Sequence, residues 1–234
     1  MTNTTDPVVI CAYARTPMGG FQGALSSVKS TALGSAAVKA AIERAGVAPE
    51  KIEQIFMGCV LPAGLGQAPA RQAALGAGLP LGVEATTLNK MCGSGLQAAV
   101  MAHDALLAGT ASVIVAGGME SMTQAPYLMN KHRGGARIGH DTIIDSMMMD
   151  GLEDAYEGKA MGVFAEGAAE KYGFTREDMD TYAIESLNRA KAAISSGAFQ
   201  KEIVPVEIET RKGVVTVSED EQPGKADPRK ITTL

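Results

Sequence analysis

Four short runs that are apolar or rich in β-branched residues alternate with helical segments through the first 120 residues, and this alternation limits the possible folds most. The runs are residues 7–14 (PVVICAYA), 54–60 (QIFMGCV), 84–89 (EATTLN) and 111–118 (ASVIVAGG). An apolar run without polar alternation is typical of a strand covered on both faces. Strands separated by helices predict an α/β fold with a mixed, mostly parallel sheet between helices.

The intervening segments predict three helices. Residues 31–45 have an apolar face, and Gly46 stands where a C-terminal cap is expected. Residues 67–77 predict a short helix with Pro69 near its first turn, and residues 93–109 predict a longer one. The core candidates of that longer helix are Leu96, Val100, Leu106 and Leu107.

Composition excludes several functional classes. There are 27 glycines, 4% aromatic residues and no tryptophan, and small side chains favour layered α/β packing over a β-sandwich. The formal net charge is −5, and the chain has no basic tract or basic amphipathic helix, so we expect neither nucleic acid nor a membrane as a partner. No apolar run is long enough for a transmembrane helix, and the first residues do not resemble a signal peptide.

The three cysteines are Cys11, Cys59 and Cys92. They are odd in number, far apart and outside any C-x-x-C motif, so no disulfide framework or zinc site is expected, and a reducing cytoplasm is predicted. Cys11 and Cys59 lie inside predicted strands, where we expect each to be a small buried apolar residue.

The character of the sequence changes after Glu120. Residues 121–162 are rich in methionine and glycine and show no clear strand, and the final residues, 221–234, are polar and predict no structural element. We therefore expect residues 1–120 to form an α/β core and residues 121–234 to form a loop or insertion domain.

Two elements are expected inside this second region. Thr175 and Asp178 match a capping box, with Asp in place of the usual Glu, at the start of a helix that runs to about Ser195. Residues 202–209 and 213–219 predict a β-hairpin or two short strands.

The motif NKMCGSG, residues 89–95, places Cys92 between a predicted strand and a predicted helix. The free N–H groups and the dipole at a helix start favour a thiolate. Gly93 and Gly95 leave room for an acyl group, and a backbone N–H near the turn can stabilise an oxyanion. Cys92 is therefore a candidate nucleophile, with a buried filler cysteine as the alternative.

The same segment also fits a dinucleotide-binding loop. Residues 93–98, GSGLQA, match G-x-G-x-x-[GA], and Glu120 ends the next predicted strand, where a ribose-binding carboxylate is expected. However, the preceding TTLNKMC is polar for a central Rossmann strand, and no second nucleotide-binding half is visible. An NAD-dependent oxidoreductase is the rival enzyme class.

The sequence offers Cys92 no clear base. His103 lies on the same predicted helix, and at ~1.5 Å per residue it is ~16 Å further along, too far for a hydrogen-bonded Cys–His pair. His132 and His140 fall in the irregular segment, where solvated loops are expected.

Four blocks of the sequence resemble the thiolase family, in the family's order. NKMCGSGLQA (89–98) resembles its acyl-thioester cysteine motif, and AGGMESMTQAPY (116–127) resembles the block that follows. ARTPMGGFQGAL (14–25) is similar to its first strand and loop, and MGVFAE (161–166) to its insertion domain. The resemblance covers essentially the whole chain. It is strongest to the acetyl-CoA acetyltransferases and the related 3-ketoacyl-CoA thiolases.

This resemblance implies a thiolase-like layered fold and Claisen condensation or thiolysis through a cysteine acyl-thioester. Cys92 would attack acetyl-CoA, acetoacetyl-CoA or another 3-ketoacyl-CoA, and its backbone N–H would line an oxyanion hole. Coenzyme A is then a substrate or product, and no bound cofactor or metal is expected. Met161 falls where the family has a methionine beside the acyl pocket, but Ala160 replaces the histidine that often precedes it in biosynthetic thiolases, which leaves the acyl chain length open.

The family's chains are longer and contain two similar halves plus the insertion. The resemblance thus implies that this chain is the N-terminal half of a thiolase together with its loop domain. We expect three features to lie outside this chain: the last strand of the N-terminal half, a catalytic histidine and a second cysteine. We expect the chain to be inactive without a C-terminal half or complementary chain, and the complete enzyme to be a homodimer or tetramer. Candidates for binding the CoA phosphates are Lys225, Arg229 and Lys230. The non-enzymatic alternative is an inactive, partner-dependent CoA-binding subunit.

Overall fold

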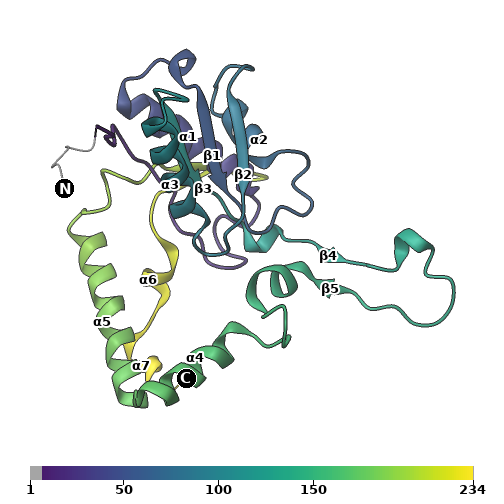
Figure 1. Cartoon of the computed structure of the whole chain (residues 1–234). Helices are drawn as coiled ribbons and strands as arrows, with labels where there is room; N and C mark the ends of the chain where they lie inside the picture. Colours follow the sequence, from purple (N-terminus) through teal and green to yellow (C-terminus); the bar gives the residue numbers. More distant parts are fainter. Residues whose placement is uncertain (1–6, 234) are drawn as a thin grey trace, which may run out of the picture.

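A computed structural model describes residues 7–233, and its centre is a three-stranded parallel sheet (Figure 1). The strands are β1 (Gln54–Gly58), β2 (Glu84–Leu88) and β3 (Ile114–Gly118), in the order β2-β1-β3. In this register Gln54 of β1 lies opposite the first residues of both neighbouring strands. Three of the four predicted strands are thus confirmed, together with their parallel arrangement.

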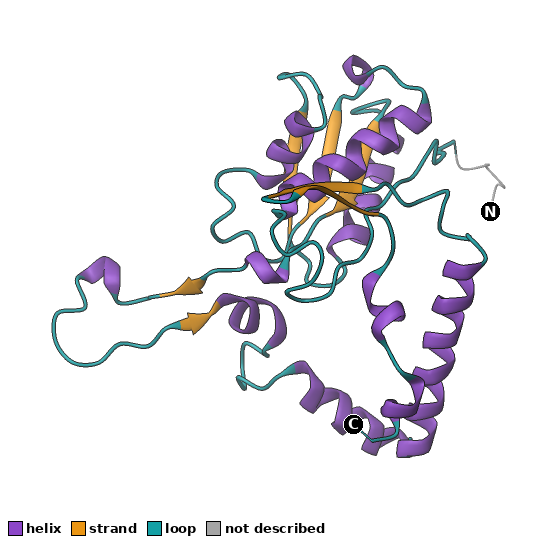
Figure 2. Ribbon diagram, turned by 180° about the vertical axis from the view of Figure 1, so that it is seen from behind, coloured by secondary structure: helices purple, strands orange, loops and turns teal. Residues whose placement is uncertain are grey.

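Helices cover both faces of this sheet. α1 (Ser30–Ala45) packs on α2 (Pro69–Gly76), and α2 packs on β1 and β2. α3 (Ser94–Leu107) packs on β1 and β3 from the other side (Figures 1 and 2). α1 ends at Gly46, whose left-handed φ of 64° confirms the predicted cap. The predicted α/β fold with the sheet between helices is therefore confirmed.

The hydrophobic core lies between β1 and the α1–α2 pair. Ile55 and Met57 are 0% and 2% exposed, and Cys59, just after β1, is 1% exposed, as predicted. The rest of the buried cluster comes from Val38, Ile42, Ile52, Leu65, Ala70, Ala73, Ala74, Ala77, Leu79, Val83 and Met119. Because strand side chains alternate in direction, Gly58 faces the opposite side of the sheet, toward α3.

The face by which α3 contacts the sheet differs from the prediction. Its buried apolar residues are Ala98 and Ala102, whereas three of the predicted core residues are exposed and Leu106 is only half-buried. The exposed ones are Leu96, Val100 and Leu107, at 74%, 44% and 53%. The small side chains of Ala98 and Ala102 let α3 lie close to the strands. Because α3 is apolar on all sides, its larger apolar residues then point outward.

The first predicted strand, residues 7–14, is not formed. Val9 and Ile10 are 72% and 87% exposed, and Cys11 is exposed, so its predicted burial is wrong. The nearest ladder contact is an isolated bridge between Arg15 and Ile203. A strand needs a backbone partner and a covering surface, and an apolar pattern does not say whether the fold supplies either.

After β3 the chain leaves the sheet and forms a long arm. η2 (Met122–Gln124) leads into β4 (Tyr127–Leu128), and η3 (His132–Gly134) lies beyond it. β5 (Ile144–Asp145) pairs antiparallel with β4 and leads into a single π-helical turn, η4 (Met148–Leu152). The arm points away from the sheet (Figure 1). Its two-residue strands are too short to leave a periodic signal in the sequence.

Two longer helices follow the arm. α4 (Met161–Tyr172) precedes α5 (Arg176–Ser195), whose capping box is confirmed. Asp178 N–H donates to Thr175 Oγ1 at 3.1 Å, and Thr175 N–H donates to an Asp178 carboxylate oxygen at 2.9 Å. α5 has no fully buried residue. None of the described helices is long and apolar enough to cross a membrane.

The last part of the chain holds a hairpin and two short helices. β6 (Val206–Thr210) and β7 (Gly213–Val217) pair antiparallel and confirm the predicted hairpin. Contrary to the prediction of an unstructured polar tail, α6 (Glu221–Lys225) and α7 (Pro228–Ile231) follow. Both contact α5, a long-range support that local polarity does not reveal.

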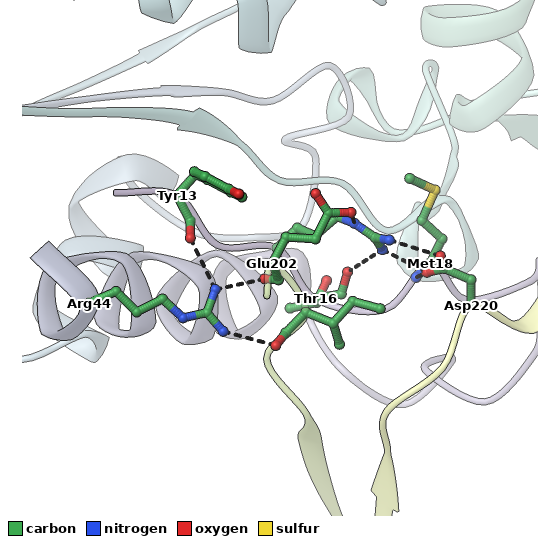
Figure 3. Close-up of polar contacts among 8 residues, drawn as sticks. Tyr13, Thr16, Met18, Arg44, Glu202 and Asp220 are labelled. Atoms are coloured by element: carbon green, nitrogen blue, oxygen red, sulfur yellow. Dashed lines mark hydrogen bonds and ion pairs between the residues drawn. The ribbon is translucent and has the colours of Figure 1, made fainter. Parts of the chain in front are cut away.

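Two arginines join this last part to the N-terminal segment (Figure 3). Arg15 pairs with Glu202 at 2.7 Å and with both carboxylate oxygens of Asp220 at 2.7 and 2.9 Å. Arg44 donates to the carbonyls of Tyr13, Glu202 and Ile203. Residues beyond 120 therefore return to the core, and the division into domains 1–120 and 121–234 stays a prediction.

Candidate active site

Cys92 lies in the connection between β2 and α3, residues 89–93, here called the Cys92 turn. Its thiol is free and exposed. The residue before it, Met91, has a φ of 49°, a left-handed conformation that costs energy for a residue with a side chain. The predicted strand-to-helix turn is therefore present, and it leaves the thiol at the surface.

Two side chains hold this turn in place. Asn89 Oδ1 accepts a hydrogen bond from Met91 N–H at 2.9 Å. Ser94 Oγ accepts from Lys90 N–H at 2.8 Å and donates to the Met91 carbonyl at 2.6 Å. Ser94 is only 5% exposed. Our sequence reasoning gave neither Asn89 nor Ser94 a role, although Asn and Ser beside a turn are residues that hydrogen-bond to nearby backbone.

Glycines let the start of α3 sit directly on the sheet. A Cβ at Gly58 would lie 2.6 Å from Ser94 Cβ and 2.9 Å from the Gly95 nitrogen. A Cβ at Gly118 would lie 3.5 Å from Gly95 Cα. The carboxyl ends of β1 and β3 thus fix the position of the Cys92 turn through close backbone contact.

The backbone N–H of Cys92 makes no hydrogen bond to any residue that the structure describes. The two N–H groups that follow are both used: Gly93 donates to the Lys90 carbonyl at 3.1 Å and Ser94 to the Met91 carbonyl at 3.0 Å. An unpaired N–H beside an exposed thiol, at the positive end of a helix, is suited to hold negative charge that develops on an acyl oxygen.

The hydrogen bonds of Glu120 argue against a dinucleotide-binding role for residues 93–98. Its two carboxylate oxygens accept from Val60 N–H at 2.8 Å and Leu61 N–H at 3.0 Å, in the loop after β1. Glu120 also lies beside the Cys59 thiol. Burial of this thiol is the main cause that raises the pKa of Cys59 to about 11, and the negative charge of Glu120 is the second cause. Glu120 is thus engaged by its own chain, and Cys59 is a protonated core residue.

The structure brings no histidine into a visible pair with Cys92. His103 is on α3 and contacts its neighbour Asp104 at 3.4 Å. His132 belongs to η3 on the arm, where its Nδ1 lies 3.0 Å from Asp141 Oδ2. The arm points away from the sheet (Figure 1). Among residues 7–233 no hydrogen bond or ion pair joins a base to the Cys92 thiol.

The other predicted site residues lie apart from the Cys92 turn. Met161 is the first residue of α4 and is 47% exposed, and α4 stands away from the sheet (Figures 1 and 2). Lys225 pairs with Glu221, and Arg229 pairs with Asp227 at 2.9 Å. Their predicted contacts with an acyl group or CoA stay predictions. Within the described residues no group of three His, Cys, Asp or Glu is placed to hold a metal.

Comparison with known proteins gives one consistent result. The family model "Thiolase, N-terminal domain" matches residues 8–228. Acetyl-CoA acetyltransferase 1 of Arabidopsis thaliana is 48% identical over 229 residues, 97% of this chain and 55% of that protein. The mitochondrial acetyl-CoA acetyltransferase of Bos taurus is 48% identical over 232 residues, 99% of this chain and 54% of that protein.

A solved structure agrees with the sequence comparison. The Acat5 thiolase from Ascaris suum, crystallised in complex with coenzyme A, superposes with a TM-score of 0.89 at 37% identity, covering 96% of this chain and 57% of that one. The chain therefore spans about half the length of the relatives it matches.

Proposed function

This chain belongs to the thiolase family, and from that premise we propose that Cys92 is the residue that accepts an acyl group from acetyl-CoA or a 3-ketoacyl-CoA. The observation that carries the proposal is the Cys92 turn, which pairs an exposed thiol with an unpaired backbone N–H at the start of α3. The NAD-dependent alternative loses its support because Glu120 is bound by the backbone of Val60 and Leu61.

In the proposed step the Cys92 sulfur, as thiolate, attacks the thioester carbonyl carbon of acyl-CoA. A new S–C bond forms, the carbonyl π electrons move to oxygen, and the Cys92 N–H donates to that oxyanion. Collapse of the intermediate breaks the bond to the CoA sulfur, and CoA leaves as a thiolate that takes up a proton. The acyl group remains on Cys92 as a thioester, which keeps its transfer potential for a second acceptor.

The complete cycle needs groups beyond those in the Cys92 turn. A base must take the Cys92 proton, and in the condensation direction another base must remove an α-proton from acetyl-CoA. We assign these roles to the histidine and second cysteine of the family's C-terminal half, supplied by a longer chain or a partner chain. The same proposal puts Met161 beside the acyl pocket. It also includes assembly as a homodimer or tetramer, a role in fatty acid metabolism and a cytoplasmic location.

Peptide mass spectrometry after incubation with acetyl-CoA tests the proposal, with the chain alone and mixed with the C-terminal half of a homologous thiolase. We expect acetyl on Cys92 and none on Cys11 or Cys59. Cys11 is a stringent internal control because its thiol is also exposed, so selective acetylation of Cys92 cannot follow from exposure alone. Equal labelling of Cys11 and Cys92, or no labelling of Cys92 in either sample, would contradict the proposal.

A further inference from the structure

The Ser94 hydroxyl fixes the orientation of the peptide unit that carries the Cys92 N–H. The Met91 carbonyl and the Cys92 N–H belong to one planar peptide group and point in opposite directions. Ser94 holds that carbonyl twice, through Oγ at 2.6 Å and through its own N–H at 3.0 Å. Because the carbonyl is directed toward Ser94, the Cys92 N–H is directed away from it.

The same hydroxyl also holds the start of the turn. Ser94 Oγ accepts from Lys90 N–H at 2.8 Å, so one buried atom bridges the peptide units before and after the left-handed Met91. Asn89 Oδ1 fixes the peptide unit between them, through Met91 N–H at 2.9 Å. Three consecutive peptide units are thereby restrained, and a flip of the strained Met91 backbone would break these hydrogen bonds.

These contacts are not those of an ordinary helix cap. A capping serine precedes the helix and accepts from N–H groups two or three residues further on. Ser94 is instead the first residue of α3, after Gly93 at the cap position, and no side chain caps this helix start. Its hydroxyl reaches backward to residues 90 and 91, and its Cβ is seated against Gly58 of β1. The serine therefore connects the rigid sheet to the turn.

We propose that Ser94 is a positioning residue, which aims the Cys92 N–H at the oxyanion formed when the thiol is acylated. This inference rests on the proposed acyl transfer at Cys92. Ser94 touches no reacting atom and acts only through the Met91–Cys92 peptide. Without its hydroxyl that peptide can rotate, and the N–H then spends part of its time pointing away from the acyl oxygen.

Two reactions of the same thiol separate positioning from general damage. Acylation of Cys92 by 4-nitrophenyl acetate passes through an oxyanion: the sulfur bonds to the carbonyl carbon, and collapse breaks the ester bond and releases 4-nitrophenolate. Alkylation by iodoacetamide displaces iodide at a saturated carbon and forms no oxyanion. Removing an oxyanion donor costs about 10²–10³ in rate, so in Ser94→Ala we expect the acylation-to-alkylation ratio at Cys92 to fall roughly tenfold or more.

The matched control is Ser35→Ala in α1, which deletes another partly buried hydroxyl, one that donates to the Thr31 and Ala73 carbonyls at 2.9 and 3.1 Å. It should leave the ratio unchanged. Both rates are read at Cys92 by peptide mass spectrometry on the full chain, with circular dichroism to show that each variant is folded. An unchanged ratio in folded Ser94→Ala, or an equal fall in Ser35→Ala, would overturn the proposal.

A second measurement does not depend on a variant. A crystal structure of the acylated wild-type chain should keep the Met91 carbonyl on Ser94, with the thioester oxygen facing the Cys92 N–H, and a flipped Met91–Cys92 peptide would refute the role of Ser94. The reagents also separate this inference from the proposed function. Cys92 that reacts with 4-nitrophenyl acetate and not with acetyl-CoA contradicts the proposed function, whereas the ratio still reports on Ser94.

Discussion

The thiol of Cys59 lies 3.7 Å from a carboxylate oxygen of Glu120, where β1 and β3 end side by side. Burial and then the negative charge of Glu120 raise the pKa of Cys59 from 9.0 to about 11. Because the folded-state pKa is the higher one, the protonated thiol contributes stability that is complete below pH 9 and is lost as the pH rises toward 11.

We therefore expect the thermal midpoint of the chain to fall between pH 9 and 11, and to fall less steeply in Cys59→Ala. Lysine and tyrosine residues titrate in the same range, so the informative quantity is the difference in slope between the two proteins. Differential scanning fluorimetry across this range provides it. Parallel curves for wild type and Cys59→Ala would show that Cys59 is not the group responsible.

Glu120 should also matter for stability at neutral pH. Its carboxylate accepts the N–H groups of Val60 and Leu61, and Glu120→Ala leaves both without that acceptor. Hydrogen bonds to charged groups contribute about 1.5–3 kcal/mol each, although water can replace part of this at a half-buried site, so we expect a loss of roughly 1–3 kcal/mol in urea unfolding. Glu53→Ala is the matched control, because the Glu53 carboxylate accepts from Ser112 N–H at 3.2 Å at an exposed position. Its effect should stay within about 0.5 kcal/mol.

Gly58 is expected to be intolerant of a side chain. A Cβ there would lie 2.6 Å from Ser94 Cβ and 2.8 Å from the Ser94 carbonyl carbon, so Gly58→Ala must move the start of α3. Overpacking of this kind costs about 1–3 kcal/mol, and the shifted turn should also slow acylation of Cys92. At Gly82 a Cβ would meet no atom within 4 Å, which makes Gly82→Ala the control. Unfolding free energies and Cys92 acylation rates for the two variants should separate clearly, and similar values for both would contradict the close contact.

The sheet that carries the Cys92 turn was predictable from sequence because its signals are local. Apolar or β-branched runs marked β1, β2 and β3, and Gly46 marked the end of α1. The position of Cys92 between strand and helix followed from those patterns alone. Family membership followed from four motifs whose order along the chain is specific.

The parts that sequence reasoning missed depend on contacts distant in the chain. The apolar pattern of residues 7–14 gave no information on whether a partner strand would be available. Leu96 looked like a core residue because α3 is apolar on several sides, and only the close approach of Gly58 decides which side faces in. Ser94 is a common residue at a helix start, and its backward hydrogen bonds are visible only in three dimensions.

Glu221 should make one loop sensitive to acid. Its carboxylate pairs with Lys225 and accepts from Gly20 N–H at 2.7 Å and Ala24 N–H at 2.9 Å. Lys225 first, and then these two N–H groups, lower the pKa of Glu221 from 4.5 to about 2. A lowered folded-state pKa means that this stabilisation is present above pH 4.5 and is lost as the pH falls toward 2.

The corresponding experiment compares wild type with Glu221→Gln by hydrogen exchange of residues 18–25. We expect faster exchange of this loop in the variant at neutral pH, and loss of the difference as the pH approaches 2. Glu177→Gln, in the first turn of α5, is the control and should leave the loop unaffected. Equal protection of the loop in wild type and Glu221→Gln at neutral pH would show that the carboxylate does not hold it.

Arg15 should fix the last part of the chain onto the N-terminal segment through the shape of its guanidinium group. It binds Asp220 through two nitrogens and Glu202 through a third (Figure 3). It also lies 5.0 Å from the centre of the Phe199 ring. Lysine keeps the charge but cannot make this planar set of contacts, so Arg15→Lys is not conservative here. We expect it to cost about 1–3 kcal/mol, because hydrogen bonds between charged groups are lost at a partly buried site.

Arg189→Lys gives the comparison, since Arg189 pairs with Glu185 at 2.7 Å on the exposed surface of α5. A surface pair of this kind contributes about 0–1 kcal/mol, so this variant should unfold close to wild type. Limited proteolysis adds a local readout: with Arg15→Lys, cleavage within residues 199–220 should precede cleavage of the sheet. If Arg15→Lys and Arg189→Lys unfold at the same urea concentration with the same cleavage order, the guanidinium geometry of Arg15 does not hold the two parts together.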